Sequence, residues 1–255
     1  IAGSSGLIGT QLVAFLDTGN HEVWRLVRRE SDPNKNEITW YPDKGEIDSK
    51  ELEGFDVVIH LGGVGIGDKR WSKKRKAAIR DSRVNSTKLL SKTLANLDNK
   101  PDLFMLASAI GFYGNRGDEE LDESSSGGEL GYFLTDVCNE WENSANSAKE
   151  GGIRTITLRT GIVISAVGGA LGKMLLPAKM GAGGPIGSGK QWMSWISMDD
   201  QIYSMYHLMM SEGASGEYNL TAPNPVRQKQ FARTLGKVLR SCLLYTSPSP
   251  RDLRK

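Results

Sequence analysis

The first nine residues, Ile1 to Gly9, carry three glycines at Gly-x-x-Gly-x-x-Gly spacing directly before an apolar stretch of helical periodicity. Glycines let the backbone turn sharply out of a strand and approach a diphosphate closely, and the following helix points its free N–H groups at the anion. The same spacing also occurs in ordinary glycine turns, so its context must decide. The pattern predicts a dinucleotide pyrophosphate site formed by Gly3, Ser4, Ser5, Gly6, Leu7, Ile8 and Gly9.

Strand and helix patterns alternate after this loop. Helical periodicity predicts helices over 7–16, 72–97 and 132–149, and apolar runs predict strands over 22–27, 38–41, 56–61, 103–108 and 154–159. This order is typical of an α/β protein with a Rossmann-type doubly wound parallel sheet, whose ligand lies at the carboxyl ends of the strands.

The same patterns predict three regions. Residues 1–160 form a nucleotide-binding Rossmann domain whose first strand is truncated, because almost nothing precedes the glycine loop. Residues 161–240, which glycines and prolines interrupt, form a smaller mixed region on the substrate side that completes part of the Rossmann core. Residues 241–255 resemble translated adapter sequence and are interpreted as a non-native tail.

Composition excludes several classes of function. The chain has 255 residues and a net charge of +2, so neither nucleic acid nor membrane is an expected partner, and a small-molecule substrate is favoured. The basic run from Lys69 to Lys76 is interpreted as a solvated helix start. Two cysteines and three histidines, all dispersed, predict neither a disulfide framework nor a metal site, and a cytoplasmic location is expected. The oligomeric state stays open.

The residues that close the second predicted strand indicate which nucleotide is bound. A carboxylate at this position accepts a hydrogen bond from the free 2′-hydroxyl of NAD(H), whereas a guanidinium matches the 2′-phosphate of NADP(H). This strand ends with Arg28 and Arg29. NADP(H) is therefore the predicted cofactor, although either arginine could instead point into solvent.

Seven motifs together resemble the extended short-chain dehydrogenase/reductase superfamily, and within it the atypical "epimerase family protein" subgroup. The resemblance spans residues 1 to about 240 and includes segments 2–9, 60–63, 70–71 with 80–87, 108–114, 158–163, 183–189 and 195–200. It implies an NAD(P)-binding epimerase/dehydratase-like oxidoreductase with a small C-terminal domain.

The resemblance also implies further cofactor-binding positions. Leu61, Gly62 and Gly63 would pass backbone alongside the cofactor ribose, unless they form a plain turn after the strand. Arg83 would contact a cofactor phosphate or ribose, with a surface ion pair to an acid such as Asp81 as the alternative. Val163, in the segment after the sixth strand, would face the nicotinamide carboxamide.

The catalytic pattern of the superfamily is incomplete in this chain. Typical members use a Tyr-x-x-x-Lys pair, in which lysine lowers the pKa of the phenol, together with a serine. Here Ser108 fits the serine position, but Asp136 stands four residues after Tyr132. The candidate catalytic residues are Ser108, Tyr132 and Tyr113, and each also has a purely structural interpretation. Two functions therefore remain open: an oxidoreductase or epimerase of unknown substrate, and a non-catalytic NADPH-binding redox sensor or regulatory protein.

Overall fold

The computed structural model describes residues 1–32 and 34–239, so the predicted non-native tail, 241–255, lies outside the described residues. The chain divides into two compact units. The first comprises Ile1–Thr160 with Asp199–Leu220, and the second comprises Gly161–Met198 with the residues from Thr221 onward. The segment that contains α6 and β10 thus returns to the first unit.

A parallel sheet forms the centre of the first unit. Ala2 bridges β1 on one side and β4 on the other, which gives the strand order β2-β1-Ala2-β4-β5-β6-β10. The short β3 pairs antiparallel with β2 at the edge. The strands are β1 Arg25–Val27, β2 Glu37–Tyr41, β3 Glu46–Ile47, β4 Val57–His60, β5 Leu103–Ala109, β6 Arg154–Thr160 and β10 Gly216–Leu220. The predicted doubly wound α/β fold is confirmed.

The three helices that the sequence predicts in the first unit begin and end close to the predicted positions, with one exception. Ser72 caps α2 by accepting a hydrogen bond from the Arg75 N–H at 3.2 Å. The helix predicted over 132–149 is two helices, and Ser144 at the break bonds its hydroxyl to the carbonyl of Trp141, in competition with the helical ladder. The helices are α1 Leu7–Leu16, α2 Lys73–Ala95, α3 Phe133–Asn143, α4 Asn146–Glu150 and α6 Met198–Met210, with 3-10 turns η1 Ser49–Leu52 and η2 Ile110–Tyr113.

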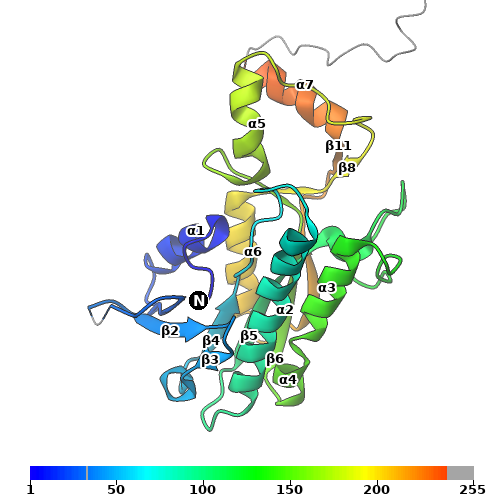
Figure 1. The fold of residues 1–255 in the computed structure, drawn as a ribbon. Coiled ribbons are helices and arrows are strands. Elements are labelled where there is room, and N and C mark those ends of the chain that lie inside the picture. Colours follow the sequence, from blue (N-terminus) through cyan, green and yellow to red (C-terminus); the bar gives the residue numbers. More distant parts are fainter. Residues whose placement is uncertain (33, 240–255) are drawn as a thin grey trace, which may run out of the picture. The chain divides into compact units, whose positions relative to one another are not determined.

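Helices α2, α3 and α4 cover one face of this sheet (Figure 1). Because successive strand residues point to opposite faces, Val58 and Phe104 join the buried cluster under these helices, whereas Ile59 and Met105 face the other side. The cluster also contains Leu90, Leu94 and Trp141 from the helices, among other residues. Alternation within nearly continuous apolar strands therefore gives the sheet a core on both faces.

Helices α1 and α6 pack against each other through aromatic rings. The ring of Phe15 on α1 lies 5.6 Å from that of Tyr203 and 5.2 Å from that of Tyr206 on α6, both edge to face. Residues 199–210 are far from α1 in the sequence, so this contact explains why the chain returns to the first unit before β10.

The second unit contains short strands and two helices. Strand β7 pairs parallel with β9, and β8 pairs antiparallel with β11. Its elements are β7 Ile162–Ile164, α5 Gly169–Lys179, β8 Trp192–Met193, β9 Trp195–Ser197, β11 Val226–Arg227 and α7 Gln228–Leu239. Within residues 1–32 and 34–239, no helix combines the length and the apolar character needed to cross a bilayer.

Candidate functional site

The glycine loop turns between Ala2 and α1 in a conformation that side chains would block. Gly3 has φ +80°, and a Cβ placed on it would lie 2.7 Å from the backbone nitrogen of Gly62. Gly6 precedes α1, donates its N–H to the Gly3 carbonyl at 3.0 Å, and leaves the helix N-terminus without a side-chain cap. Uncapped N–H groups and the positive helix end favour a bound anion, so this loop fits a pyrophosphate.

Replacing Gly9 with alanine is expected to disrupt this loop. A Cβ at Gly9 would lie 2.2 Å from the Gly3 carbonyl oxygen, which is backbone and has no room to yield. Overpacking of this kind destabilises proteins by about 1–3 kcal/mol. Thermal unfolding and an NADPH titration of Gly9→Ala would check the result, with Gly213→Ala, whose Cβ meets nothing within 4 Å and whose φ is not positive, as a control for the loss of a glycine. Unfolding and binding equal to those of the wild type would contradict the prediction.

Arg28 and Arg29 follow β1 at the carboxyl end of the sheet, and both are exposed. They have different environments. Arg29 binds Glu37, with Nη2 2.7 Å from Oε1 and Nη1 2.8 Å from Oε2. Arg28 has no hydrogen bond or ion pair with any other residue that the structure describes. At the strand end where the sequence predicts the 2′-phosphate, Arg28 is therefore unpaired within the described structure, whereas Arg29 is paired with an acid.

The turn after β4 brings a second backbone segment to the glycine loop. Leu61 donates its N–H to the Ala2 carbonyl at 2.9 Å, which holds residues 61–63 beside Gly3. A Cβ at Gly63 would lie 3.0 Å from Cζ of Arg83, so the arginine lies directly against this turn. The structure therefore brings together two segments that are about 60 residues apart in the sequence.

Arg83 supports the turn rather than forming the alternative ion pair. Its Nη1 donates to the carbonyls of Val64 at 3.0 Å and Ile79 at 2.9 Å, and its guanidinium lies 5.0 Å from the Trp141 ring. Asp81 pairs with Arg80 instead. Burial lowers the pKa of Arg83 below its ordinary value.

His60, the last residue of β4, is completely buried beneath this turn. Its Nδ1 accepts the Gly62 N–H at 3.2 Å, so the proton resides on Nε2, which donates to Ser86 Oγ at 2.8 Å. The Ser86 hydroxyl in turn donates to the Ser82 carbonyl at 2.7 Å. Burial, with added repulsion from Arg83, lowers the pKa of His60 to about 3. The imidazole is neutral in the native protein.

This neutral histidine predicts an acid-sensitive fold. Since the folded pKa lies below the unfolded value of about 6.5, the stabilisation is complete above pH 6.5 and is lost as the pH falls toward 3. Over that window His60 lowers the free energy of unfolding by about 1.4 kcal/mol per pH unit. Urea denaturation between pH 4.5 and 7 should show a shallower pH dependence for His60→Asn than for the wild type. Parallel curves would contradict the role of His60.

A buried polar network lies at the carboxyl ends of β5 and β6. Ser108 Oγ donates to Glu142 Oε1 at 2.6 Å. Arg159 donates to the same carboxylate from Nε at 3.1 Å and from Nη2 at 2.9 Å. Its Nη1 donates to the phenol oxygen of Tyr113 at 3.1 Å, and that phenol donates to Oδ1 of Asn219 at 2.8 Å. Two candidate catalytic residues, Ser108 and Tyr113, therefore share one network.

The charges in this network balance. Three hydrogen bonds from Ser108 and Arg159 converge on the oxygens of Glu142, an arrangement that an ionised carboxylate satisfies. Burial alone would lower the pKa of Arg159, but its bonds to Glu142 and Tyr113 and the charge of Glu142 raise it above its ordinary value. The ion pair is 6% exposed at Arg159 and 10% at Glu142.

Tyr132 lies apart from this network. It precedes α3, and the residue is 64% exposed. Asp136 does not serve the phenol, because its Oδ1 accepts the Gly131 N–H at 2.9 Å. Nothing in the described structure supplies Tyr132 with the cation that lysine provides in a Tyr-x-x-x-Lys pair.

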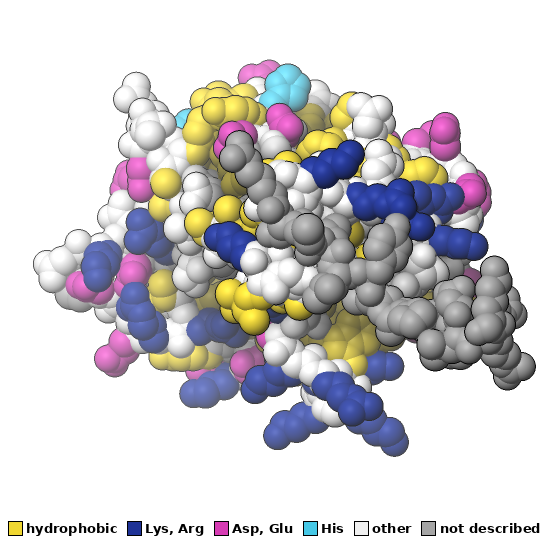
Figure 2. All heavy atoms as spheres, turned by 90° about the horizontal axis from the view of Figure 1, so that it is seen from above, with side chains coloured by type: hydrophobic (Ala, Val, Ile, Leu, Met, Phe, Trp, Pro, Cys, Tyr) yellow, Lys and Arg dark blue, Asp and Glu magenta, His cyan; other side chains and the backbone are white. Residues whose placement is uncertain are grey.

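The remaining predicted features fall outside this cluster. Val163 lies in β7 of the second unit. The side chains of the run from Lys69 to Lys76 are exposed except for that of Arg75, which is half-buried. Lys and Arg side chains project from several parts of the face shown in Figure 2, interspersed with hydrophobic ones. No group of three His, Cys, Asp or Glu side chains suited to a metal ion occurs among the residues described.

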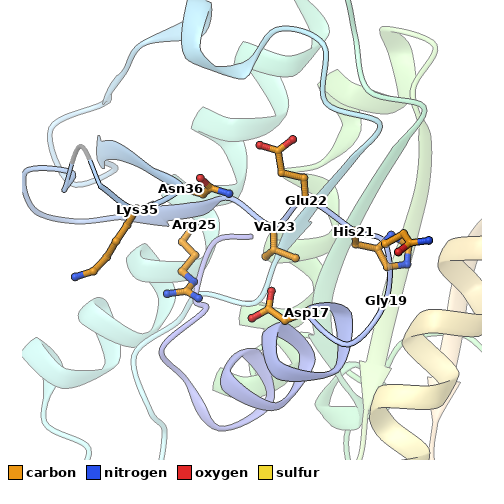
Figure 3. A pocket seen from close by; sticks show the side chains of 9 residues that line it. Asp17, Gly19, His21, Glu22, Val23, Arg25, Lys35 and Asn36 are labelled. Carbon is orange, nitrogen blue, oxygen red and sulfur yellow. The ribbon is translucent and has the colours of Figure 1, made fainter.

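The cavity drawn in Figure 3, of about 540 Å³, does not belong to the candidate site. It is lined by Asp17, by residues that precede β1, by Arg25 at the start of β1, and by Lys35 and Asn36 just before β2. These residues lie at the amino ends of β1 and β2, whereas Arg28, Arg29 and the turn after β4 lie at the carboxyl ends. Ligands of open α/β sheets bind at the carboxyl ends.

Sequence reasoning missed the partners of the predicted residues. Glu37, Glu142 and Asn219 were not among the candidates, although each binds one that was. One signal was present: Arg159 follows four uncharged residues, 155–158, near the end of a strand, and a buried arginine requires a paired acid. The sequence alone did not indicate which acid.

The strand order, the glycine loop against the turn after β4, and the uncapped α1 define a Rossmann-type dinucleotide-binding protein of the α/β class. Residues 1–221 match the model of the NAD dependent epimerase/dehydratase family. The chain belongs to this family, as its sequence motifs predicted.

Several known proteins are similar to this chain. Epimerase family protein Mb2239 of Mycobacterium bovis is 40% identical over 239 residues, which cover 94% of this chain and 78% of that protein. YfhF of Bacillus subtilis, also an epimerase family protein, is 34% identical over 240 residues, covering 93% and 78%. Among solved structures, human epimerase family protein SDR39U1 with NADPH aligns with a TM-score of 0.84 and 30% identity over 96% of this chain and 80% of that one.

Proposed function

We propose that this chain is an NADP(H)-dependent oxidoreductase or epimerase that acts on a small carbonyl-containing or sugar-like molecule. The observation that carries this proposal is the uncapped N-terminus of α1 behind Gly3 and Gly6, with Arg28 and Arg29 at the end of the next strand. The similar human structure, which contains NADPH, supports the choice of cofactor. When bound, the nicotinamide accepts or donates the hydride.

The cofactor-binding residues divide the dinucleotide between them. In this proposal, residues 3–9 bind the pyrophosphate, Arg28 and Arg29 bind the 2′-phosphate, and residues 61–63 lie along a ribose. Arg83 acts as a positioning residue, since its hydrogen bonds within the described structure go to backbone carbonyls, one of them in the turn that carries Gly63. Val163 remains the candidate for the carboxamide.

In this proposal, the candidates for proton transfer and for orienting the substrate are Ser108, Tyr113 and Tyr132. Ser108 donates its own hydrogen to Glu142, so its oxygen lone pairs are the groups left to accept a hydrogen bond from a substrate hydroxyl. Tyr113 and Tyr132 are the two candidate acids. Tyr113 has an adjacent guanidinium, and Tyr132 has greater exposure to solvent.

Two measurements test this function. NADPH binding is measured first by fluorescence titration, and carbonyl compounds and nucleotide sugars are then screened for oxidation of NADPH or for epimer exchange. Turnover that Ser108→Ala reduces, with NADPH affinity retained, is the expected result. Tight NADPH binding with no turnover in either panel would instead contradict the oxidoreductase proposal and leave a cofactor-binding protein.

A further inference from the structure

Glu37, at the start of β2, is a buried acid beside the proposed 2′-phosphate site. Its side chain is only 4% exposed, and its two oxygens bind the two terminal nitrogens of Arg29 at 2.7 and 2.8 Å. Oε2 also accepts the N–H of Asp32 at 3.0 Å. Two parallel N–H···O bonds fix both the position and the plane of a guanidinium group. Arg29 is therefore held in one orientation although its side chain is 56% exposed.

The bonds that Arg29 makes leave one edge of its guanidinium unused. Arginine has five N–H donors. One N–H on Nη1 and one on Nη2 bind Glu37. The second N–H on Nη1 binds the Glu30 carbonyl at 2.8 Å. The two that remain, on Nε and Nη2, lie side by side in the planar group and match two oxygens of a phosphate. No residue in the described parts of the chain accepts a hydrogen bond from either.

We propose that Glu37 is a positioning residue that presents this free edge of Arg29 to the 2′-phosphate, and thereby sets the preference for NADP(H) over NAD(H). The inference rests on the proposed function, because it requires the adenosine ribose to lie at the end of β1. It assigns different roles to the two arginines. Arg28 supplies a charge that no neighbour cancels, and the Arg29–Glu37 pair supplies a fixed fork with no net charge.

Glu37 has two opposing effects on an anion. Its negative charge repels the phosphate, but Arg29 neutralises that charge at 2.7 Å and the solvent around the 56% exposed Arg29 side chain screens the repulsion. Its hydrogen bonds hold a side chain whose free rotation would otherwise weaken binding up to about thirty-fold. Ordering is the larger effect, so the loss of Glu37 should weaken NADPH binding. A purely electrostatic role predicts the opposite sign.

The test compares dissociation constants for NADPH and NADH, measured by fluorescence titration on the full chain. Glu37→Gln removes the charge and one side of the fork, and Glu37→Asp keeps the charge but withdraws the carboxylate. We expect both to weaken NADPH binding about five- to tenfold and to change NADH binding less than twofold. In an Arg29→Ala background, Glu37→Gln should no longer weaken NADPH binding, because no guanidinium is left for Glu37 to position. Thermal unfolding of each variant verifies that the fold is retained.

The outcomes separate this inference from the proposed function. Unchanged or tighter NADPH binding by Glu37→Gln and Glu37→Asp, while Arg29→Ala weakens it, would overturn the positioning role alone. Equal losses for NADPH and NADH would show that Glu37 only maintains the loop, and would overturn it as well. Wild-type protein that binds neither dinucleotide would overturn both the proposed function and this inference.

Discussion

Replacing Arg28 and Arg29 together with alanine is expected to raise the dissociation constant for NADPH about 100-fold and to leave that for NADH within about threefold. The selectivity arises because only NADPH carries the 2′-phosphate, and hydrogen bonds from a cation to an anion are about twice as strong as neutral ones. Both arginines follow β1 at the end of the sheet where the glycine loop lies. Fluorescence titrations with the two cofactors measure the effect.

The single variants provide the controls. Arg28 is exposed and unpaired within the described structure, so Arg28→Ala should lose part of its effect as salt is raised, because salt screens exposed charges. Arg25→Ala, on the same strand but before its carboxyl end, is the matched control and should leave both affinities unchanged. If the double variant weakened NADH as much as NADPH, the assignment of the 2′-phosphate site would be wrong.

Glu142→Gln is expected to lower the free energy of unfolding by about 3–5 kcal/mol. The substitution leaves the Arg159 guanidinium buried without its counter-charge. It also weakens the hydrogen bond that the Ser108 hydroxyl donates to residue 142. For a protein of this size, that loss lowers the melting temperature by about 10 °C. Differential scanning calorimetry and urea denaturation measure it.

A double substitution distinguishes the contribution of the ion pair to stability from the contribution of side-chain packing. Glu142→Leu with Arg159→Met removes both charges and retains apolar volume, so it should recover at least half of the stability lost in Glu142→Gln. Ser108→Ala should cost less, about 1–3 kcal/mol, because it leaves the ion pair intact. A Glu142→Gln protein as stable as the wild type would show that Arg159 finds another partner.

Local patterns predicted most of the elements but not their exact limits. The helix starting at Leu7 ends at Leu16 as predicted, because its apolar spacing and the following Gly19-Asn20 stop are encoded within a few residues. The helix predicted over 132–149 was wrong in one respect, since Ser144 bonds back to Trp141 and splits it. The sequence predicted that part of 161–240 completes the Rossmann core, but it did not indicate that α6 and β10 are that part, because this depends on contacts such as Phe15 with Tyr206.

The sequence by itself determined the parts of this protein that depend on near neighbours: the glycine loop, the alternation of strands and helices, and the two arginines at a strand end. Only the tertiary structure decided which side chains face one another. Ser108 meets Glu142 across 34 residues, and Tyr113 meets Asn219 across 106. Such partners are set by how helices, turns and strands pack around the sheet, and residue spacing along the chain does not encode that packing.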